Sequence, residues 1–350
     1  MIKKIAKRFI SDYRYWSYHL DHKKSALKVL KSIESVKGKT DKKLIKLSDD
    51  YANDVLGWKG YAPWLYVYSA VNNNFKEGWI PDNYYGKIVV PALKGNYGII
   101  ADYNSLTSRL FNSSHFPDCA YYTNGIWISP KYQVLSEKEV VEIAFNKNEK
   151  VVYKIDNSLQ GRGVYFLDKN NINIGKLMSL GNGVLQKYIN QHPFFQNIIA
   201  NSVATLRITS VINEKGIVSV RACYLRVGRS SDKHVKSASH IRIPVNILTG
   251  ELDKYGYTTN WIQIVKHPDT NFLFEHKKIP NFNKFLETTI NLHKMVPFTR
   301  TIGWDMVLDV NNNVQVMEWN GGHNDIKFSE ATQGPCFSDL SWEKLWKKGS

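Results

Sequence analysis

The pattern of hydrophobic and polar positions divides the chain into a helical N-terminal region and a longer region rich in strands. Within residues 1–48 the apolar side chains recur at helical spacing: Ile2, Ile5 and Phe9, then Leu27, Leu30 and Ile33. Further along, short runs rich in β-branched and aromatic residues, bounded by glycine or polar residues, predict strands. We expect these strands at residues 151–155, 164–167, 184–189, 205–212 and 217–227.

Local signals add hairpins and helices to the second region. Residues 121–128 surround an Asn124-Gly125 pair, which favours a tight hairpin. The sequence Ser136-Glu137-Lys138-Glu139 is a capping box, so a helix should begin there. Another helix is expected over about 281–296. These elements predict an α+β chain in which most strand pairs are antiparallel.

The most informative stretch is a second hairpin over residues 303–320. Two runs of alternating polarity are joined there by an asparagine-rich turn. If Asp309 pairs with Val314, the register places Asp305 opposite Glu318. Two carboxylates facing each other across a sheet should repel and destabilise it.

A divalent cation between these carboxylates would remove the repulsion. Asp305, Glu318 and Asn320 should share one face of the hairpin, because side chains alternate between faces. Oxygen ligands of this kind suit Mg²⁺, which often bridges one or two carboxylates to substrate phosphates. The segment alone fits an ordinary hairpin with an exposed polar face equally well.

Length, composition and charge narrow the class of protein. A chain of 350 residues, 43% of them hydrophobic and 13% aromatic, should form two or three subdomains. The net charge of +16 favours anionic partners such as nucleotides, phosphorylated sugars, nucleic acid or an anionic membrane. The three cysteines are Cys119, Cys223 and Cys336; they are too few and too scattered for a disulfide framework or a metal cluster, which suits a reducing cytoplasm.

The basic N-terminal region has two interpretations. No apolar segment follows it as in a signal peptide, and no run approaches the roughly 18 apolar residues of a membrane span. Its helices could present a solvated basic face. Alternatively, the lysines together with Phe9, Tyr13 and Trp16 could bind an anionic membrane surface.

Two further segments carry groups suited to phosphate binding. A strand ends at Lys154, a loop with Gly161 and Gly163 follows, and the chain then re-enters a strand. Glycines let backbone N–H groups approach phosphate oxygens closely, although a plain turn would have the same sequence. Arg207 and Arg226 lie on later strands; either they are surface residues, or their guanidinium groups bind phosphate or carboxylate.

Taken together, this order of motifs resembles the ATP-grasp superfamily, in particular the sugar-transfer associated ATP-grasp proteins of surface-polysaccharide biosynthesis. The resemblance covers roughly residues 100–325. Its most specific part is Gly303-Trp304-Asp305, with Glu318 thirteen residues after Asp305 and Asn320 two further on. It implies two β-rich subdomains that clasp ATP, preceded by a helical extension. We therefore expect a basic N-terminal region at 1–85 and an ATP-grasp domain at 86–340, with the ATP-lid subdomain at about 150–192.

The resemblance also implies roles for individual residues. The phosphate-binding lysine is Lys154, with the glycine loop closing over the phosphates. The expected cofactor-binding residues are Lys154, Gly161, Arg162, Gly163, Gln186, Lys187, Tyr188 and Ile189, the last four along the adenine. The expected Mg²⁺ ligands are Asp305, Glu318 and Asn320, and the expected catalytic residues are Arg207 and Arg226.

Three departures from the family pattern limit what can be transferred. The acidic residue common at the start of the hinge strand is Gln186 here. The upstream Asp-Lys-Asn motif reads Asp102-Tyr103-Asn104, so a second phosphate lysine is not assignable. Residues 230–234 replace a glycine-rich segment, so the acceptor cannot be taken from the family.

The function implied is an ADP-forming carboxylate–amine ligase that uses ATP and Mg²⁺ and proceeds through an acylphosphate. It would join an amino acid or amine to an anionic, uronic-acid sugar, nucleotide- or lipid-linked, in capsule or O-antigen biosynthesis. We expect a cytoplasmic protein, with peripheral contact at the inner face of the membrane, and no nucleic-acid partner. Two alternatives stay open: a kinase of a sugar or lipid-linked hydroxyl, and a non-enzymatic basic module that binds nucleic acid or membrane.

Overall fold

A computed structural model describes residues 2–158, 163–231 and 239–348. The chain forms two compact units, one of Met1–Gly95, Asn260–Gln263 and Asp325–Ser350, the other of Asn96–Thr259 and Ile264–Asn324. The domain boundaries expected from the sequence, at residue 85 and around the ATP lid, stay a prediction.

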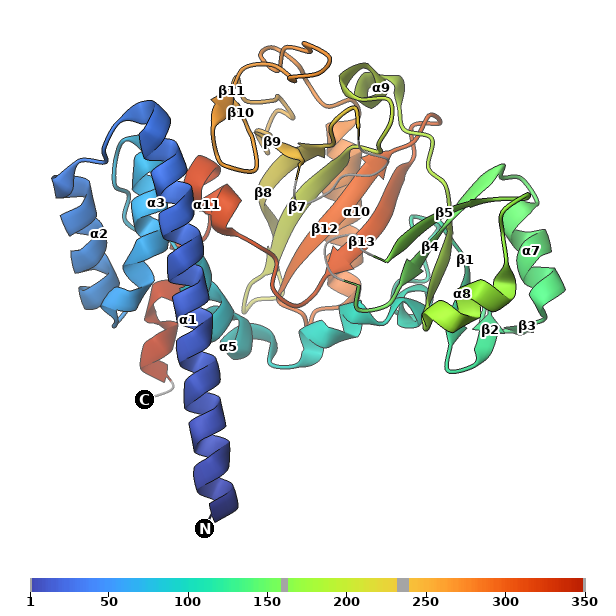
Figure 1. Cartoon of the computed structure of the whole chain (residues 1–350), viewed down its shortest axis with the longest axis horizontal. Helices are drawn as coiled ribbons and strands as arrows, with labels where there is room; N and C mark the ends of the chain where they lie inside the picture. Colours follow the sequence, from blue (N-terminus) through green and yellow to red (C-terminus); the bar gives the residue numbers. More distant parts are fainter. Residues whose placement is uncertain (1, 159–162, 232–238, 349–350) are drawn as a thin grey trace. The chain divides into compact units, whose positions relative to one another are not determined.

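The first unit is helical, as the spacing of apolar residues predicts (Figure 1). Its helices are α1 (Ile2–Lys37), α2 (Lys42–Asp54), α3 (Ala62–Asn72), α4 (Asp82–Tyr84), α5 (Val90–Lys94) and α11 (Lys327–Gln333). α1 packs against α3, and burial on α1 begins at His19 and continues through Ala26, Leu30 and Ile33. The described turns of α1 before His19 therefore carry no buried side chain.

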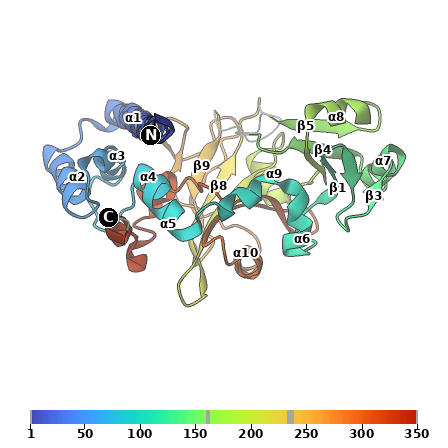
Figure 2. The same ribbon diagram turned by 90° about the horizontal axis from the view of Figure 1, so that it is seen from below.

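The second unit contains two antiparallel sheets. The smaller has six strands in the order β3-β2-β1-β6-β4-β5. These are β1 (Asp118–Thr123), β2 (Ile126–Ile128), β3 (Val134–Leu135), β4 (Lys150–Ile155), β5 (Val164–Asp168) and β6 (Gly183–Lys187). Helices α7 (Glu137–Phe145) and α8 (Ile174–Leu180) cover one face, where Val140 and Leu177 pack against Tyr153 and Leu185 (Figure 2).

The larger sheet has seven strands in the order β11-β10-β9-β8-β7-β12-β13. These are β7 (Thr205–Ile212), β8 (Val218–Val227), β9 (Ile241–Pro244), β10 (Gly256–Tyr257), β11 (Gln263–Ile264), β12 (Thr301–Leu308) and β13 (Val314–Asn320). Helix α10 (Phe282–Met295) covers one face of this sheet (Figure 2). Phe285 of α10 belongs to the same core as Ile208 and Trp304, and this core occupies the face opposite Arg207 and Asp305.

The remaining elements connect these layers. The 3₁₀ turns at Tyr97–Asp102 and Asn104–Leu106 and the short helix α6 (Thr107–Phe111) precede β1. The short helix α9 (Pro193–Ile198) lies between β6 and β7. Gly98 contacts the chain just after β13 so closely that an added Cβ would lie 2.2 Å from the Gly321 carbonyl oxygen. The backbone can therefore make this approach only with a glycine at residue 98.

Most of the predicted elements are confirmed. Asn124 and Gly125 both have positive φ in the turn between β1 and β2, as the Asn-Gly pair requires. Ser136 and Glu139 form the expected capping box at the start of α7. The five predicted strands correspond to β4, β5, β6, β7 and β8, the helix expected over about 281–296 is α10, and the α+β class is confirmed.

The register of the second hairpin is partly different from the prediction. Asp305 does lie opposite Glu318, but Val314 pairs with Leu308 rather than with Asp309. Asp305 pairs with Glu318 and Met306 pairs with Val316, so Met317 has no partner on β12. This bulge at Met317 shifts the register by one residue. The asparagine-rich turn is thus one residue longer than predicted, and the bulge restores the pairing of the two carboxylates.

Candidate active site

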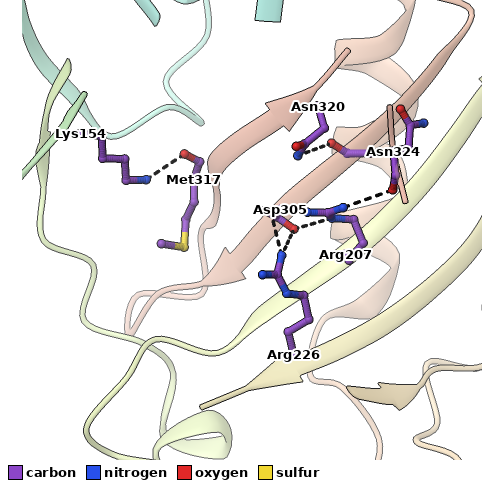
Figure 3. Close-up of polar contacts among 8 residues, drawn as sticks. Lys154, Arg207, Arg226, Asp305, Met317, Asn320 and Asn324 are labelled. Atoms are coloured by element: carbon purple, nitrogen blue, oxygen red, sulfur yellow. Dashed lines mark hydrogen bonds and ion pairs between the residues drawn. The ribbon is translucent and has the colours of Figure 1, made fainter. Parts of the chain in front are cut away.

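A buried, ion-paired carboxylate lies on the face of the larger sheet opposite the core beneath α10. Asp305 accepts hydrogen bonds from Arg207 Nε at 2.7 Å and Arg207 Nη2 at 2.8 Å, a bidentate pair (Figure 3). Arg226 Nη1 lies 3.1 and 3.2 Å from the same two oxygens. Arg207 Nη1 also donates to the Asn324 carbonyl at 3.3 Å. The strand register brings the three charged groups together, because Arg207 on β7 pairs with Asp305 on β12.

This contact favours the charged forms of Asp305 and Arg207. Burial disfavours the Asp305 carboxylate, but Arg207 and Arg226 hold its pKa well below the usual range. Burial likewise opposes the Arg207 charge, and Asp305 overcomes that effect and raises the pKa of Arg207. With Asp305 ionised, the cluster of this carboxylate and the two arginines carries one net positive charge.

Glu318 and Asn320 lie beside this cluster on β13. The Glu318 side chain is exposed, and no residue in the described part of the chain donates a hydrogen bond to its carboxylate. The protein atoms around it and the nearby Asp305 charge raise the pKa of Glu318. The Asn320 amide nitrogen donates to the Gly303 carbonyl at 3.2 Å, which leaves Oδ1 as an acceptor.

The donor set at these positions fits a Mg²⁺ ion that is also held by phosphate. Within the described ranges no cluster of three or more His, Cys, Asp or Glu side chains could hold a metal by itself. Glu318 and Asn320 Oδ1 are oxygen donors not committed to other residues, and Mg²⁺ commonly takes one or two carboxylates with phosphate and water. Asp305 could join them only by sharing its oxygens with Arg207 and Arg226. Its assignment as a metal ligand stays a prediction.

Lys154 connects the two sheets of the second unit. Its Nζ donates to the Met317 carbonyl at 3.0 Å (Figure 3). The ammonium group therefore lies beside the peptide bond that joins Met317 to Glu318. Met317 is the bulged residue of β13, and a bulge releases one residue from the ladder. Burial lowers the pKa of Lys154, whereas the carboxylates of Glu318, Asp118 and Asp305 oppose that shift. The lysine predicted to bind phosphate thus lies next to the backbone of one predicted metal ligand, Glu318.

The glycine loop after β4 is described only in part. Gly161 and Arg162 lie outside the described residues. Gly163 is buried, and its carbonyl accepts from Ile155 N at 3.0 Å. An added Cβ on Gly163 would lie 2.6 Å from the Ser158 Cβ, so the close approach requires glycine here.

The predicted adenine strand is β6 and the residues that follow it. Gln186 is buried and pairs with Val152 of β4. Val152 and Lys154 are two residues apart on β4, so Gln186 lies on the same face of the sheet as Lys154. Lys187 is exposed, and its backbone N–H donates to the Pro117 carbonyl at 2.8 Å. Tyr188 packs its ring near Phe166, and Ile189 is half-buried.

The hydrogen-bond and ion-pair partners of the predicted site residues were not predicted from the sequence. Asp118 on β1 accepts a hydrogen bond from Gln186, and nothing in the local sequence around Asp118 indicates this contact. The pairing of Arg207 and Arg226 with Asp305 was also not predicted. Alternation along each strand indicated which residues share a face with Asp305 and which share one with Arg207. The adjacency of the two residues depends on the order of β7 and β12 in the sheet.

Residues 162–339 match the profile of the family described as sugar-transfer associated ATP-grasp. No curated protein matches the sequence. Solved structures with a similar fold include the ATP-grasp ligase PsnB with a minimal precursor (10% identity, 73% of this chain and 64% of that chain, TM-score 0.42).

Two further structures are similar at the same level. One is biotin carboxylase from Campylobacter jejuni with β-γ-ATP (13% identity, 91% of this chain and 68% of that chain, TM-score 0.45). The other is N5-carboxyaminoimidazole synthetase from Staphylococcus aureus with ADP (13% identity, 68% of this chain and 49% of that chain, TM-score 0.41). The chain spans less than two thirds of the length of PsnB and of the synthetase. Because the family profile covers just over half of the 350 residues, the chain belongs to the sugar-transfer associated ATP-grasp family, and the resemblance and the ATP-grasp fold expected from the sequence are confirmed.

Proposed function

We propose that the protein is an ATP-dependent, ADP-forming carboxylate–amine ligase. The observation that carries the proposal is the position of Lys154. Its ammonium group extends from the smaller sheet to the Met317 carbonyl, next to Glu318 on the larger sheet. A cation and a metal-compatible carboxylate from two different sheets are thereby close together, which supports a phosphate site between them.

The proposed reaction has two steps. In the first, an oxygen of the acceptor carboxylate attacks the γ-phosphorus of ATP, the bond to the β,γ-bridging oxygen breaks, and ADP leaves. In the second, an amine attacks the carbonyl carbon of the acylphosphate, phosphate leaves with the electron pair of the C–O bond, and the amine loses a proton. The product is an amide, together with ADP and phosphate.

The residues of the site have distinct roles in this proposal. Lys154 neutralises charge on the transferring phosphate, and Arg207 and Arg226 orient phosphate or carboxylate oxygens. Glu318 and Asn320, with Asp305, would hold Mg²⁺, which supplies further charge neutralisation on the phosphates when it is bound. Gln186, Lys187, Tyr188 and Ile189 would lie along the adenine, and the loop with Gly161, Arg162 and Gly163 would cover the phosphates.

For the acceptor we propose an anionic sugar, specifically a uronic acid linked to a nucleotide or lipid, in capsule or O-antigen biosynthesis. The family description supports a sugar-related substrate. The net charge of +16 and the surplus positive charge around Arg207 and Arg226 favour an anionic one. The amine would be an amino acid or a related small molecule.

The test is mass spectrometry of ATP-dependent products across nucleotide-linked uronic acids and amino acids. The ligase proposal predicts an amide product whose formation needs ATP, the carboxylate and the amine together, with release of ADP and free phosphate. A stable phosphorylated sugar formed without amine would instead identify a kinase. Absence of any ATP-dependent product, with no binding of Mg-ATP, would favour a non-enzymatic basic module.

We also propose that the protein works in the cytoplasm in peripheral contact with the inner face of an anionic membrane. No described helix is both long enough and apolar enough to span a bilayer. The N-terminal turns of α1 extend past α2 and α3 (Figure 1). On the described part of these turns, Tyr13 and Trp16 are 67% and 60% exposed. Exposed aromatic side chains on a basic helix suit the interface of an anionic bilayer.

A further inference from the structure

A carboxylate on a neighbouring strand holds the first residue of the predicted adenine strand. The Gln186 amide nitrogen donates to Asp118 Oδ1 at 2.8 Å, and the Tyr121 hydroxyl donates to Asp118 Oδ2 at 2.6 Å. Each carboxylate oxygen therefore has a donor. Residue 186 is itself an amide, and the carboxylate it contacts comes from the neighbouring strand β1.

A β-bulge brings this carboxylate into position. Ala120 pairs with Leu185, so regular pairing would set Cys119 opposite Gln186. The register shifts between Asp118 and Ala120, and Asp118 pairs with Gln186 instead. A bulge re-aims the side chains that precede it. Here it places Asp118 on the face that carries Gln186 rather than on the face covered by α7 and α8.

That face is the one turned toward the predicted nucleotide. Lys154 and Gln186 lie on it, and the Lys154 charge interacts electrostatically with Asp118. The opposite face, with Tyr153 and Leu185, is filled by the core beneath α7 and α8. Gln186 is 5% exposed, so its side chain has little freedom to turn away.

The contact also decides which end of the Gln186 amide faces the site. An ionised carboxylate only accepts hydrogen bonds, so it can pair with the amide NH₂ and not with the amide oxygen. Tyr121 already donates to the second carboxylate oxygen. In the described part of the chain, no group donates to Gln186 Oε1, which leaves this oxygen as an oriented acceptor.

We propose that Asp118 is a positioning residue for nucleotide choice: by fixing the Gln186 amide, it presents Oε1 as an acceptor for the exocyclic amine of the purine. The inference rests on the proposed function, because it needs the base to lie along β6. An amino group at the purine 6-position donates to this oxygen. A carbonyl at the same position would bring two acceptors together, which is costly in a buried site.

The test compares ATP with inosine triphosphate, which carries a carbonyl at the 6-position, and with purine riboside triphosphate, which carries only hydrogen there. Affinities are measured by calorimetry with Mg²⁺ at pH 8, an alkaline pH chosen because burial raises the pKa of the Asp118 carboxyl. The wild type should bind ATP most tightly and inosine triphosphate about 10- to 100-fold more weakly, with purine riboside triphosphate between them.

Asp118→Asn should reduce the preference for ATP over inosine triphosphate at least tenfold. An asparagine side chain can either accept a hydrogen bond from the Gln186 amide or donate one to it, so the two ends of that amide can exchange places. Gln186→Met should abolish the preference as well, and it serves if Asp118→Asn does not fold. Tyr121→Phe is the matched control: it removes the other donor to Asp118 without changing which end of Gln186 faces the base. Its ratio of affinities should equal that of the wild type, even if all three nucleotides bind more weakly.

The possible outcomes separate the inference from the proposed function. Equal binding of ATP and inosine triphosphate by the wild type would overturn the inference and leave the ligase proposal intact. An unchanged ratio in folded Asp118→Asn and Gln186→Met would do the same, because a merely structural role lowers all affinities together. Failure of the wild type to bind any of the three nucleotides would overturn both.

Discussion

Arg207 and Asp305 form a buried, bidentate ion pair between adjacent strands β7 and β12, with nitrogen–oxygen distances of 2.7 and 2.8 Å. The sequence alone predicted that Asp305 and Glu318, facing each other, would repel in the absence of a cation. In the structure the arginines neutralise Asp305, so the two opposed carboxylates have different environments. Asp305 is paired and buried, whereas Glu318 is exposed and receives no hydrogen bond from the described residues.

This difference predicts opposite effects of two amide substitutions on the protein without ligands. Asp305→Asn should lower the free energy of unfolding by about 3 kcal/mol, because it leaves the buried Arg207 charge without its partner. Glu318→Gln should leave stability unchanged or slightly higher, since it removes a carboxylate that Asp305 disfavours. Urea unfolding of both variants at neutral pH measures the contrast. A Glu318→Gln loss as large as that of Asp305→Asn would contradict the ion-pair assignment.

Lys154 should bind the nucleotide phosphates with a charge that is lost at alkaline pH. Burial lowers its pKa below the ordinary 10.5, and the neutral amine no longer attracts phosphate. Affinity for Mg-ATP should therefore fall as pH rises through this lowered pKa. Lys154→Arg should bind without that decline, and Lys154→Ala should bind about 10- to 100-fold more weakly at pH 7.

The control for Lys154 is Lys150→Ala, at the exposed start of the same strand. Calorimetric titrations between pH 7 and 10 compare these variants with the wild type. Equal affinity of Lys154→Ala and the wild type would show that Lys154 does not contact the nucleotide.

Whether a feature of the structure can be predicted from the sequence depends on how far apart in the chain the interacting residues lie. Alternation and turn residues are local signals, and they correctly indicated the Asn124-Gly125 turn, the helix capped by Ser136 and the opposition of Asp305 to Glu318. The bulge at Met317 has no such local signal in the sequence.

Contacts between distant strands were not predictable for the same reason. Asp118 and Gln186 are 68 residues apart, and their contact depends on the order β1-β6-β4 in the sheet and on a bulge in β1. The two arginine contacts of Asp305 likewise join strands far apart in the chain. Residue types suggested phosphate or carboxylate ligands for the arginines, but the carboxylate found in the structure belongs to the protein itself.

The buried carboxyl group of Glu330 should make the free energy of unfolding depend on pH, independently of the nucleotide site. Burial raises its pKa from 4.5 to about 7, although the backbone N–H groups of Ile80 and Cys336 donate to it. The unfolded chain ionises this group at lower pH than the folded protein does. Its contribution is therefore fully present below about pH 4.5 and is lost as pH rises to about 7, by on the order of 3 kcal/mol.

Glu330→Gln should remove this part of the pH dependence while lowering stability overall, because an amide cannot accept both N–H groups equally well. Melting temperatures of the wild type and the variant between pH 4.5 and 8 check the slope. Parallel curves would show that Glu330 titrates normally.

The exposed aromatics of α1 should govern binding to anionic membranes. Replacing Tyr13 and Trp16 together with alanine should reduce binding to liposomes containing phosphatidylglycerol, and rising salt should weaken binding of the wild type. Leu248→Ser changes an apolar side chain that is 84% exposed in the other unit and serves as the control. Sedimentation with liposomes gives the bound fraction. Binding that is absent, or insensitive to both salt and the double substitution, would leave α1 as a helix with a solvated basic face.

The most direct test of the nucleotide site is thermal melting with and without Mg-ATP. A ligand that binds only the folded state stabilises it by about 2.7 kcal/mol at one hundred times its Kd, so the wild-type melting temperature should rise clearly. Lys154→Ala, Glu318→Gln and Asp305→Asn should each show a much smaller rise, whatever their melting temperature without ligand, while Lys150→Ala should match the wild type. Equal ligand-induced rises in the wild type and all three site variants would contradict the account.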